Sequence, residues 1–213
     1  MEDNVASGVV GAGRCRRSGK GHGAMVIGLV DVQPDTLRDR LIEAADAELA
    51  EHGSLIGRFE AVAHRAGVSR ATAYRQLGSV SELLKQVGLR RSQKYIASLR
   101  EVMDAEACAL DKLEAALIYG ARVLPGDPIV LDLISRQFSR AADPEVYGLI
   151  NALMGPALAE GRRSGEIRSD VDLEFVLHYL VEQSYLATHA ADRSAQAVRR
   201  RFRMFVEPAI APS

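Results

Sequence analysis

The sequence predicts an all-α protein of about nine helices, in which three short helices precede a larger helical region. Two observations support this fold class. From residue 34 onward, apolar residues recur with a period close to 3.6, the spacing of one helix face, and no stretch shows the alternation of a half-buried strand. Aromatic residues make up only 5% of the chain and Trp is absent. The core is therefore expected to be mainly aliphatic, which suits helices.

The composition excludes several classes of protein. Of the 213 residues, 47% are hydrophobic and 26% are charged, as in an ordinary globular protein. The two cysteines, Cys15 and Cys108, are too few for a secreted scaffold stapled by disulfides. No apolar run approaches the roughly 18 residues of a membrane helix. We therefore expect a cytoplasmic protein that does not use a membrane as a partner.

Residues 1–33 differ from the rest of the chain. They contain seven glycines and a basic cluster between Arg14 and Lys20, and they show no helical or strand period. We therefore expect a flexible tail over residues 1–33. The helical pattern that follows is divided into a first domain of residues 34–83 and a second domain of residues 84–213.

Polar caps and glycine or proline breakers delimit the individual helices. Gly67 favours a tight turn because it tolerates a left-handed backbone, and Ser69 directly after it can cap the next helix. The expected helices run from Asp35 or Thr36 to Gly53, over 58–65 and 70–76, from Ser79 or Ser81 past Leu99, and over 107–123, 127–140, 144–163, 170–190 and 193–209.

The second and third helices have the pattern of a helix-turn-helix. The third helix, residues 69–76, is short, polar and basic, and it has only small residues available for packing. Residues 58–94 contain eight basic and two acidic residues, a balance of +6, whereas residues 95–213 contain 13 and 17, a balance of −4. Local basic charge on a near-neutral chain is typical of a module that faces DNA phosphates. The alternative is a solvated, Arg-rich surface hairpin.

The order of residues across segment 38–84 is a more specific signal. The matching residues are Arg38, Leu41, Ile42, Ala44, Ala45, Leu49 and Gly53, then Val62-Ala63-His64-Arg65-Ala66-Gly67-Val68-Ser69, then Thr72-Ala73-Tyr74 and Glu82-Leu83-Leu84. Together they resemble the TetR family of bacterial transcriptional repressors, and residues 165–170 resemble the joint before that family's last two helices. The resemblance implies a homodimer that binds a near-palindromic, double-stranded operator and releases it when a small-molecule effector binds.

Four positions depart from the family pattern. Leu77 stands where an aromatic residue is usual, and Val80 where a Lys usually approaches a phosphate. Arg58 replaces a common Thr at the start of the second helix and can restore a charged phosphate contact. Gln76 replaces a common His, and because Gln can bond both N6 and N7 of adenine, the preferred DNA sequence is expected to differ.

The resemblance implies DNA contacts from residues around the third helix: Arg58, Ser69, Arg70, Thr72, Ala73, Tyr74, Arg75 and Gln76. Tyr74, Ser69 and Thr72 are expected to bind phosphates, and the residues between them to approach bases, with Ala73 against a thymine methyl group. Two alternatives stay open. Arg70 and Arg75 can contact phosphates only, and Tyr74 can be a core residue that seals the small domain.

The second domain is expected to hold the effector and the dimer interface. Six aromatic or charged residues are candidates for a pocket that favours a hydrophobic ligand: Tyr119, Arg122, Phe138, Tyr147, His178 and Tyr185. The apolar residues of the last two helices are candidates for the interface: Leu173, Val176, Leu177, Leu180, Val181, Val198, Phe202, Phe205 and Val206.

Two other functions were weighed. No Gly-x-Ser-x-Gly elbow, Cys/His dyad or trustworthy metal-ligand set is found among the motifs, so we assign no catalytic residue, metal or cofactor. An all-helical adaptor protein without specific DNA binding explains the many helices but not the basic block. We therefore predict a ligand-responsive repressor, with the adaptor as the alternative.

Overall fold

The computed structural model describes residues 36–138 and 143–212, and the tail expected over residues 1–33 lies outside them. All regular secondary structure in this part of the chain is helical. The elements are α1 (Leu37–His52), α2 (Phe59–Arg65), α3 (Arg70–Leu77), α4 (Val80–Asp104), α5 (Ala109–Val123), η1 (Leu124–Gly126), α6 (Pro128–Ser135), η2 (Arg136–Phe138), α7 (Pro144–Ser164), α8 (Leu173–Thr188), α9 (Ala195–Arg201), η3 (Phe202–Val206) and α10 (Glu207–Ile210).

The all-α prediction is confirmed. Since α9, η3 and α10 follow one another without a break from Ala195 to Ile210, the described helices match the nine expected ones in order. The main differences are at helix ends. α6 closes at Ser135 and continues only as the short 3-10 turn η2, and α8 starts at Leu173, after the Asp172 cap. No described helix combines the length and the apolar character that crossing a bilayer requires.

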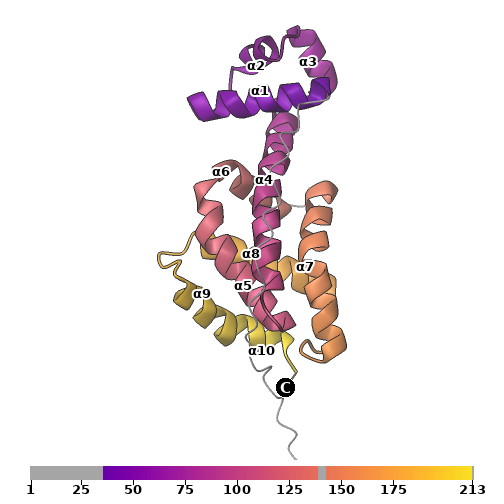
Figure 1. Cartoon of the computed structure of the whole chain (residues 1–213), viewed down its shortest axis with the longest axis vertical. Coiled ribbons are helices and arrows are strands. Elements are labelled where there is room, and N and C mark those ends of the chain that lie inside the picture. The colour runs from indigo at the N-terminus through magenta and orange to yellow at the C-terminus, as the bar shows by residue number, and fades with distance from the viewer. Residues whose placement is uncertain (1–35, 139–142, 213) are drawn as a thin grey trace, which may run out of the picture.

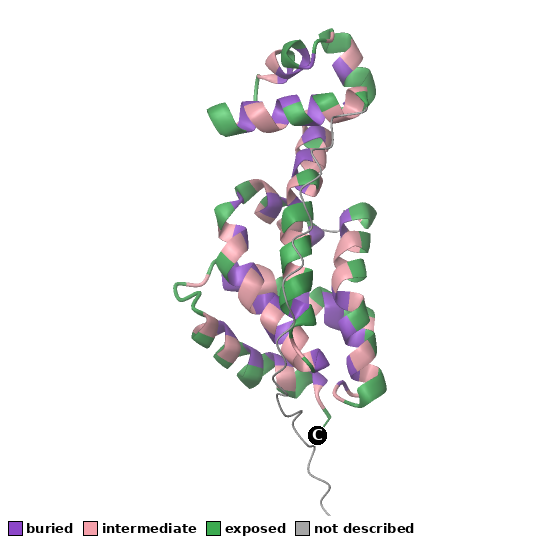
Figure 2. Cartoon of the chain, viewed as in Figure 1, coloured by how far each residue is buried: buried purple, intermediate pink, exposed green. Residues whose placement is uncertain are grey.

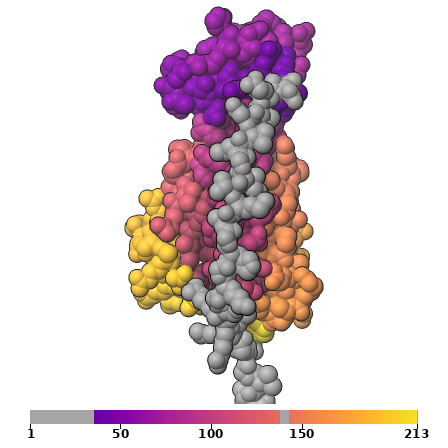
Figure 3. All heavy atoms as spheres, in the orientation of Figure 1, coloured from indigo at the N-terminus to yellow at the C-terminus, as the bar shows by residue number. Residues whose placement is uncertain are grey.

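Helices α1–α3 form a lobe at one end of the molecule, and the long helix α4 runs from this lobe into the larger helical body (Figures 1 and 3). Two clusters of buried side chains lie in these two parts (Figure 2). α4 contributes to both, because Leu83 and Val87 belong to the N-terminal cluster and Met103 to the larger one. The two parts are thus joined by a continuous helix and not by a loop.

The expected caps delimit the helices of the lobe. The side chains of Thr36, Ser69 and Ser79 accept hydrogen bonds from backbone N–H groups at the starts of α1, α3 and α4. Gly67 has φ 71°, a left-handed conformation that costs other residues free energy. It turns the chain sharply between α2 and α3, so that α3 packs across α1 and α2.

The basic face of α9 is partly an internal contact. The Nε atoms of Arg199 on α9 and of Arg203 on η3 donate to the carboxylate oxygens of Glu114 on α5, at 2.6 and 3.1 Å. Glu114 is 6% exposed. A buried carboxylate requires such partners, and here they fasten α9 to the bundle.

Candidate functional site

Helix α3 turns one face into the lobe and the other to solvent. Ala73 and Leu77 are 0% and 2% exposed and belong to the N-terminal core cluster. They are four residues apart, so they share one face of the helix. The residues that carry polar or charged groups between and before them, Arg70, Arg75 and Gln76, are exposed. α3 is therefore anchored by two small or aliphatic side chains and presents a basic outer face.

The prediction that Ala73 contacts a base is wrong, because the core encloses its side chain completely. Ala71, two residues earlier, is exposed on the outer face of α3, and the sequence-based prediction of DNA contacts did not include it. Ala73 lies four residues before Leu77, so the two share one helix face, and this spacing was the signal that the Ala73 side chain is buried. Ala71 is the alanine whose methyl group is available to a partner.

Tyr74 combines the two roles that the sequence left as alternatives. Its ring stacks on Phe59 of α2, with centroids 4.0 Å apart and planes 23° from parallel. It nevertheless remains 37% exposed, and the Arg70 guanidinium lies 5.6 Å from its ring centroid. The ring therefore helps to hold α3 on α2, while part of the side chain stays accessible on the surface.

A hydrogen-bonded row fixes the start of α3. Ser69 Oγ accepts from the Thr72 backbone N–H at 3.2 Å and lies 2.9 Å from Thr72 Oγ1. Arg75 Nη2 in turn donates to Thr72 Oγ1 at 3.2 Å. Since the row ends in a charged guanidinium, these contacts hold Arg75 against the helix in one orientation. Neither Arg70 nor Arg75 has a carboxylate partner within the described chain, so their charges are available to an anion.

Arg58 has internal partners that the sequence did not predict. Its Nε donates to Glu48 Oε2 at 2.9 Å and its Nη2 lies 2.6 Å from His52 Nε2. Arg65 binds the other oxygen of Glu48, and also Glu51. The buried Glu48 thus braces α1 against α2. A phosphate contact from Arg58 stays a prediction, but the structure gives this residue a bracing role that competes with it.

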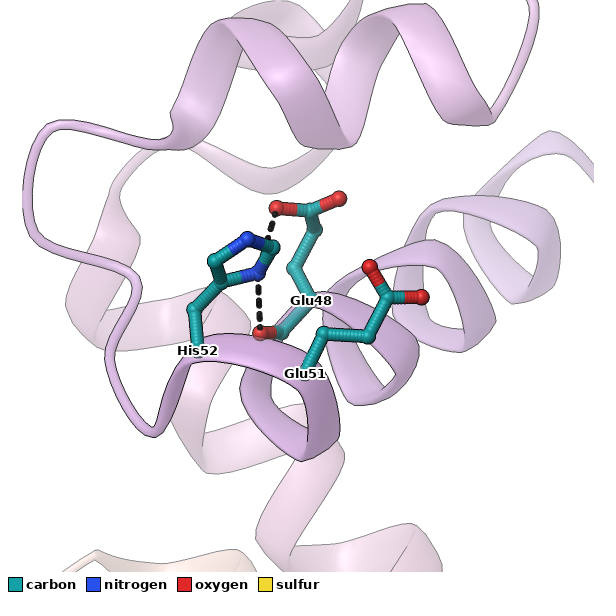
Figure 4. Close-up of side chains that lie close together, drawn as sticks. All are labelled: Glu48, Glu51 and His52. Atoms are coloured by element: carbon teal, nitrogen blue, oxygen red, sulfur yellow. Dashed lines mark hydrogen bonds and ion pairs between the residues drawn. The ribbon is translucent and has the colours of Figure 1, made fainter.

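Glu48, Glu51 and His52 lie close enough to hold a metal ion, as Figure 4 shows. The geometry favours an ion-pair network instead. Hydrogen bonds from Arg58 and Arg65 lower the pKa of Glu48 below the ordinary value of 4.5. A cation would have to displace these two guanidinium groups, which already satisfy the carboxylate.

Internal ion pairs also reduce the basic block that the sequence suggested. Arg65 pairs with Glu48 and Glu51, Arg91 with Asp46, and Lys85 with three carboxylates. Much of the +6 balance is therefore neutralised within the fold. Among the described residues of the block, Arg70 and Arg75 of α3 and the exposed Arg90 of α4 have no carboxylate partner, so the positive charge left for a partner lies on α3 and α4.

The larger part of the chain encloses an apolar cavity of about 110 Å³ between α4, α5, α6, α7 and α8. None of its lining residues carries a formal charge. The wall is aliphatic except for two tyrosines, two serines and one glycine. The lining residues are Ser92, Tyr95, Ile96, Leu99, Ala116, Leu117, Tyr119, Gly120, Leu124, Val130, Leu133, Ile134, Val146, Leu149, Ile150, Leu153, Met154, Val181 and Ser184.

Comparisons with known proteins agree with this arrangement. No family model matches the chain. FadR of Thermus thermophilus, a TetR-family transcriptional repressor solved with lauroyl-CoA, aligns with a TM-score of 0.62 and 18% identity over 83% of this chain and 96% of that one. The fatty acid degradation regulator FadR of Bacillus halodurans gives a TM-score of 0.56 and 18% identity over 78% and 98%.

The chain has the TetR-family fold. In sequence it is similar to a curated relative, the fatty acid metabolism regulator protein of Bacillus subtilis strain 168. The two are 28% identical over 141 residues, which is 63% of this chain and 72% of the relative.

Within this TetR fold, the cavity wall differs from the six predicted ligand residues. Only Tyr119 lines the cavity. Arg122 is exposed, and Phe138 ends η2 with a side chain outside the described part of the structure. The remaining three form aromatic pairs away from the cavity: Tyr147 with His178, at 5.0 Å, and Tyr185 with His189, at 4.4 Å. Burial and the nearby Glu174 raise the pKa of Tyr147.

The predicted ligand residues are aromatic or charged, whereas the wall of the cavity is mainly aliphatic. Ser92, Tyr95, Ile96 and Leu99 of α4 all line the cavity. Their spacing of three and four residues marks one helix face, and this spacing was the available signal.

The predicted dimer residues lie on α8 and on the run from α9 into η3, but mostly on the inner face of these helices. Seven of the nine are buried in the chain's own core: Val176, Leu177, Leu180, Val181, Val198, Phe202 and Val206. Leu173 is half-buried and Phe205 is 62% exposed. The large apolar side chains that do reach the surface here are Phe175, Leu186, Met204 and Phe205. Seven of the nine assignments are therefore wrong, because the strongest apolar stripe of each helix packs inward.

Proposed function

We propose that this chain is a ligand-responsive transcriptional repressor that binds a near-palindromic operator as a homodimer. The observation that carries the proposal is the outer face of α3. It is exposed, basic and without carboxylate partners, and it lies on a lobe at the end of the molecule. The similarity of the fold to TetR-family regulators supports the same function.

The proposed DNA-binding unit comprises residues 36–83. Arg70, Arg75 and Gln76 are the candidates for base or phosphate contacts, and Ala71 replaces Ala73 as the candidate for a thymine methyl group. Tyr74, Ser69 and Thr72 are proposed to bind phosphates, which fix the position of the protein on the duplex. Arg58 is a phosphate contact only if it leaves Glu48.

The proposed dimer uses the outer faces of α8 and of the helical run from α9 to α10. Phe175, Leu186, Met204 and Phe205 expose between 53% and 73% of their surface. Large apolar side chains left exposed are candidates for an interface, because soluble monomers rarely expose much contiguous apolar surface. Two-fold symmetry would then place two α3 helices roughly 34–36 Å apart, one turn of DNA.

Residues 84–212 are proposed to bind a hydrophobic effector in the cavity. The wall has no charge to pair with an ionic ligand, so the part of the effector that enters must be apolar. The TetR-fold FadR of Thermus thermophilus was solved with lauroyl-CoA. An acyl chain is therefore the first class of molecule to try, although a cavity of about 110 Å³ must widen to take a long one.

Fluorescence anisotropy with DNA from around the protein's own gene tests the proposal. Specific binding is expected to exceed binding to a scrambled duplex by ~10³ or more, and to weaken steeply with salt as counterions are released. Arg75→Ala is expected to abolish the preference, and Arg100→Ala, an exposed arginine on α4, is the matched control. A folded dimer that binds no duplex even at low salt would instead favour the adaptor function.

A further inference from the structure

Helix α6 contacts both the cavity and the core of the N-terminal lobe. Val130, Leu133 and Ile134 line the cavity, while Ile129 packs against the N-terminal cluster. α4 and α6 are so close that a Cβ atom added at Gly88 would lie 3.3 Å from Leu133 Cδ2. A molecule that displaces α6 therefore also disturbs packing against the lobe.

Asp127, the N-cap of α6, adds polar contacts between the start of α6 and α4. It is 4% exposed. Its Oδ1 accepts from the Val130 backbone N–H at 3.4 Å and from Arg91 Nη1 at 3.2 Å, and its Oδ2 accepts from the Tyr95 hydroxyl at 3.1 Å. Because Tyr95 belongs to the cavity wall, one buried carboxylate ties together the wall, the start of α6 and Arg91.

Arg91 extends the connection to α1. Its Nε and Nη2 lie 2.7 and 2.5 Å from Oδ1 of Asp46. Hydrogen bonds between charged groups are short and strongly directional, so they transmit a displacement better than an aliphatic contact does. Arg91 thus joins a residue of α1, on which α2 and α3 pack, to the N-cap of a cavity helix.

We propose that Asp127 and Arg91 are positioning residues that couple the cavity to the DNA-binding lobe. A molecule that moves Tyr95 or the first turn of α6 draws Asp127 away from Arg91, and Arg91 then shifts Asp46 and changes the tilt of α1 on α4. The inference rests on the proposed function, of which it describes the regulation. It needs no knowledge of the effector, because every contact of the relay is made between residues of the chain itself.

A double-mutant cycle on the full chain tests the relay. Asp127→Asn keeps a good N-cap but loses the charge that holds Arg91. We expect it to weaken operator binding about tenfold, within the range of known coupling between sites. In an Asp46→Asn background the same change is expected to have no further effect, because the connection is already broken. Asp132→Asn is the control: Asp132 is exposed on α6 and pairs with Arg136 of the following turn.

Amide hydrogen exchange provides a readout that does not depend on DNA. Asp127→Asn and the milder Tyr95→Phe are expected to speed exchange in the middle of α1, which is distant from both residues in sequence, whereas Asp132→Asn is not. The relay is overturned if the losses of operator affinity caused by Asp46→Asn and Asp127→Asn multiply in the double variant. Unchanged amide exchange in α1 would also overturn it. If the wild-type protein binds no specific DNA, while Asp127→Asn and Tyr95→Phe still speed exchange in α1, the proposed function is overturned and the relay stands.

Discussion

The ring of Tyr74 lies on the ring of Phe59, with centroids 4.0 Å apart, so the one aromatic side chain of α3 fastens this helix to α2 while part of it stays exposed. The packing of α3 and the proposed phosphate contact therefore meet in one residue. Aromatic pairs of this geometry contribute roughly 0.5–1.5 kcal/mol beyond their buried area. The hydroxyl adds nothing to the stacking and is available for a phosphate.

This relationship separates two substitutions at Tyr74. Tyr74→Phe keeps the stacking and loses the hydroxyl, so we expect an unchanged melting temperature and an operator affinity about tenfold weaker, which corresponds to one hydrogen bond of roughly 1.4 kcal/mol. Tyr74→Ala is expected to lower both the melting temperature and the operator affinity. Calorimetry and anisotropy on the same samples provide the comparison. Full affinity in Tyr74→Phe would show that the residue acts only in packing.

The Glu48 network predicts a pH dependence of stability. Because Arg58 and Arg65 lower the pKa of Glu48 in the folded state, its contribution is complete above the ordinary value of 4.5 and is lost as the pH falls through the lower folded value. Glu48→Gln is expected to be less stable at pH 7 and to lose less stability on acidification. Thermal unfolding between pH 7 and pH 3 measures this, with Glu43→Gln as the control, because Glu43 is exposed on α1 and outside this network. Parallel pH curves for wild type and Glu48→Gln would contradict the assignment.

The cavity predicts a compensating pair of substitutions. A Cβ atom at Gly120 would lie 2.6 Å from Ser184 Oγ, and both residues line the wall. Gly120→Ala is therefore expected to lower the melting temperature by overpacking, at a cost of roughly 1–3 kcal/mol. Adding Ser184→Ala removes the clashing oxygen and is expected to recover most of the loss. Equal melting temperatures for the single and double variants would show that the wall adapts without strain.

The exposed apolar side chains of the last helices predict the oligomeric state. Phe175→Glu and Phe205→Glu place a charge at the proposed interface, and each is expected to give a folded monomer, since a buried, unpaired charge is costly. Light scattering after size exclusion gives the mass, and circular dichroism checks the fold. Ile56→Glu is the control, because Ile56 is 88% exposed but lies on the lobe. A dimer that survives both substitutions places the interface elsewhere.

Local sequence signals were sufficient for the N-terminal lobe. Thr36, Ser69 and Ser79 cap the helices that their positions predicted, and Gly67 has the left-handed backbone expected of the turn. Caps and turns act within a few residues, so the sequence contains all the partners they need. The same period of 3.6 predicted every described helix of the larger part, although not which partner each apolar face would meet.

By itself, then, the sequence determined the helices, their order and the basic, exposed character of the third helix of this protein. Tertiary structure decided what long-range packing controls. It turned Ala73 inward, buried seven of the nine candidate interface residues, gave Arg58 an internal partner, and brought Arg199 to Glu114 across 85 residues of chain. Periodicity shows that a helix has an apolar face. Only the folded chain shows whether that face meets its own core, a cavity or a second subunit.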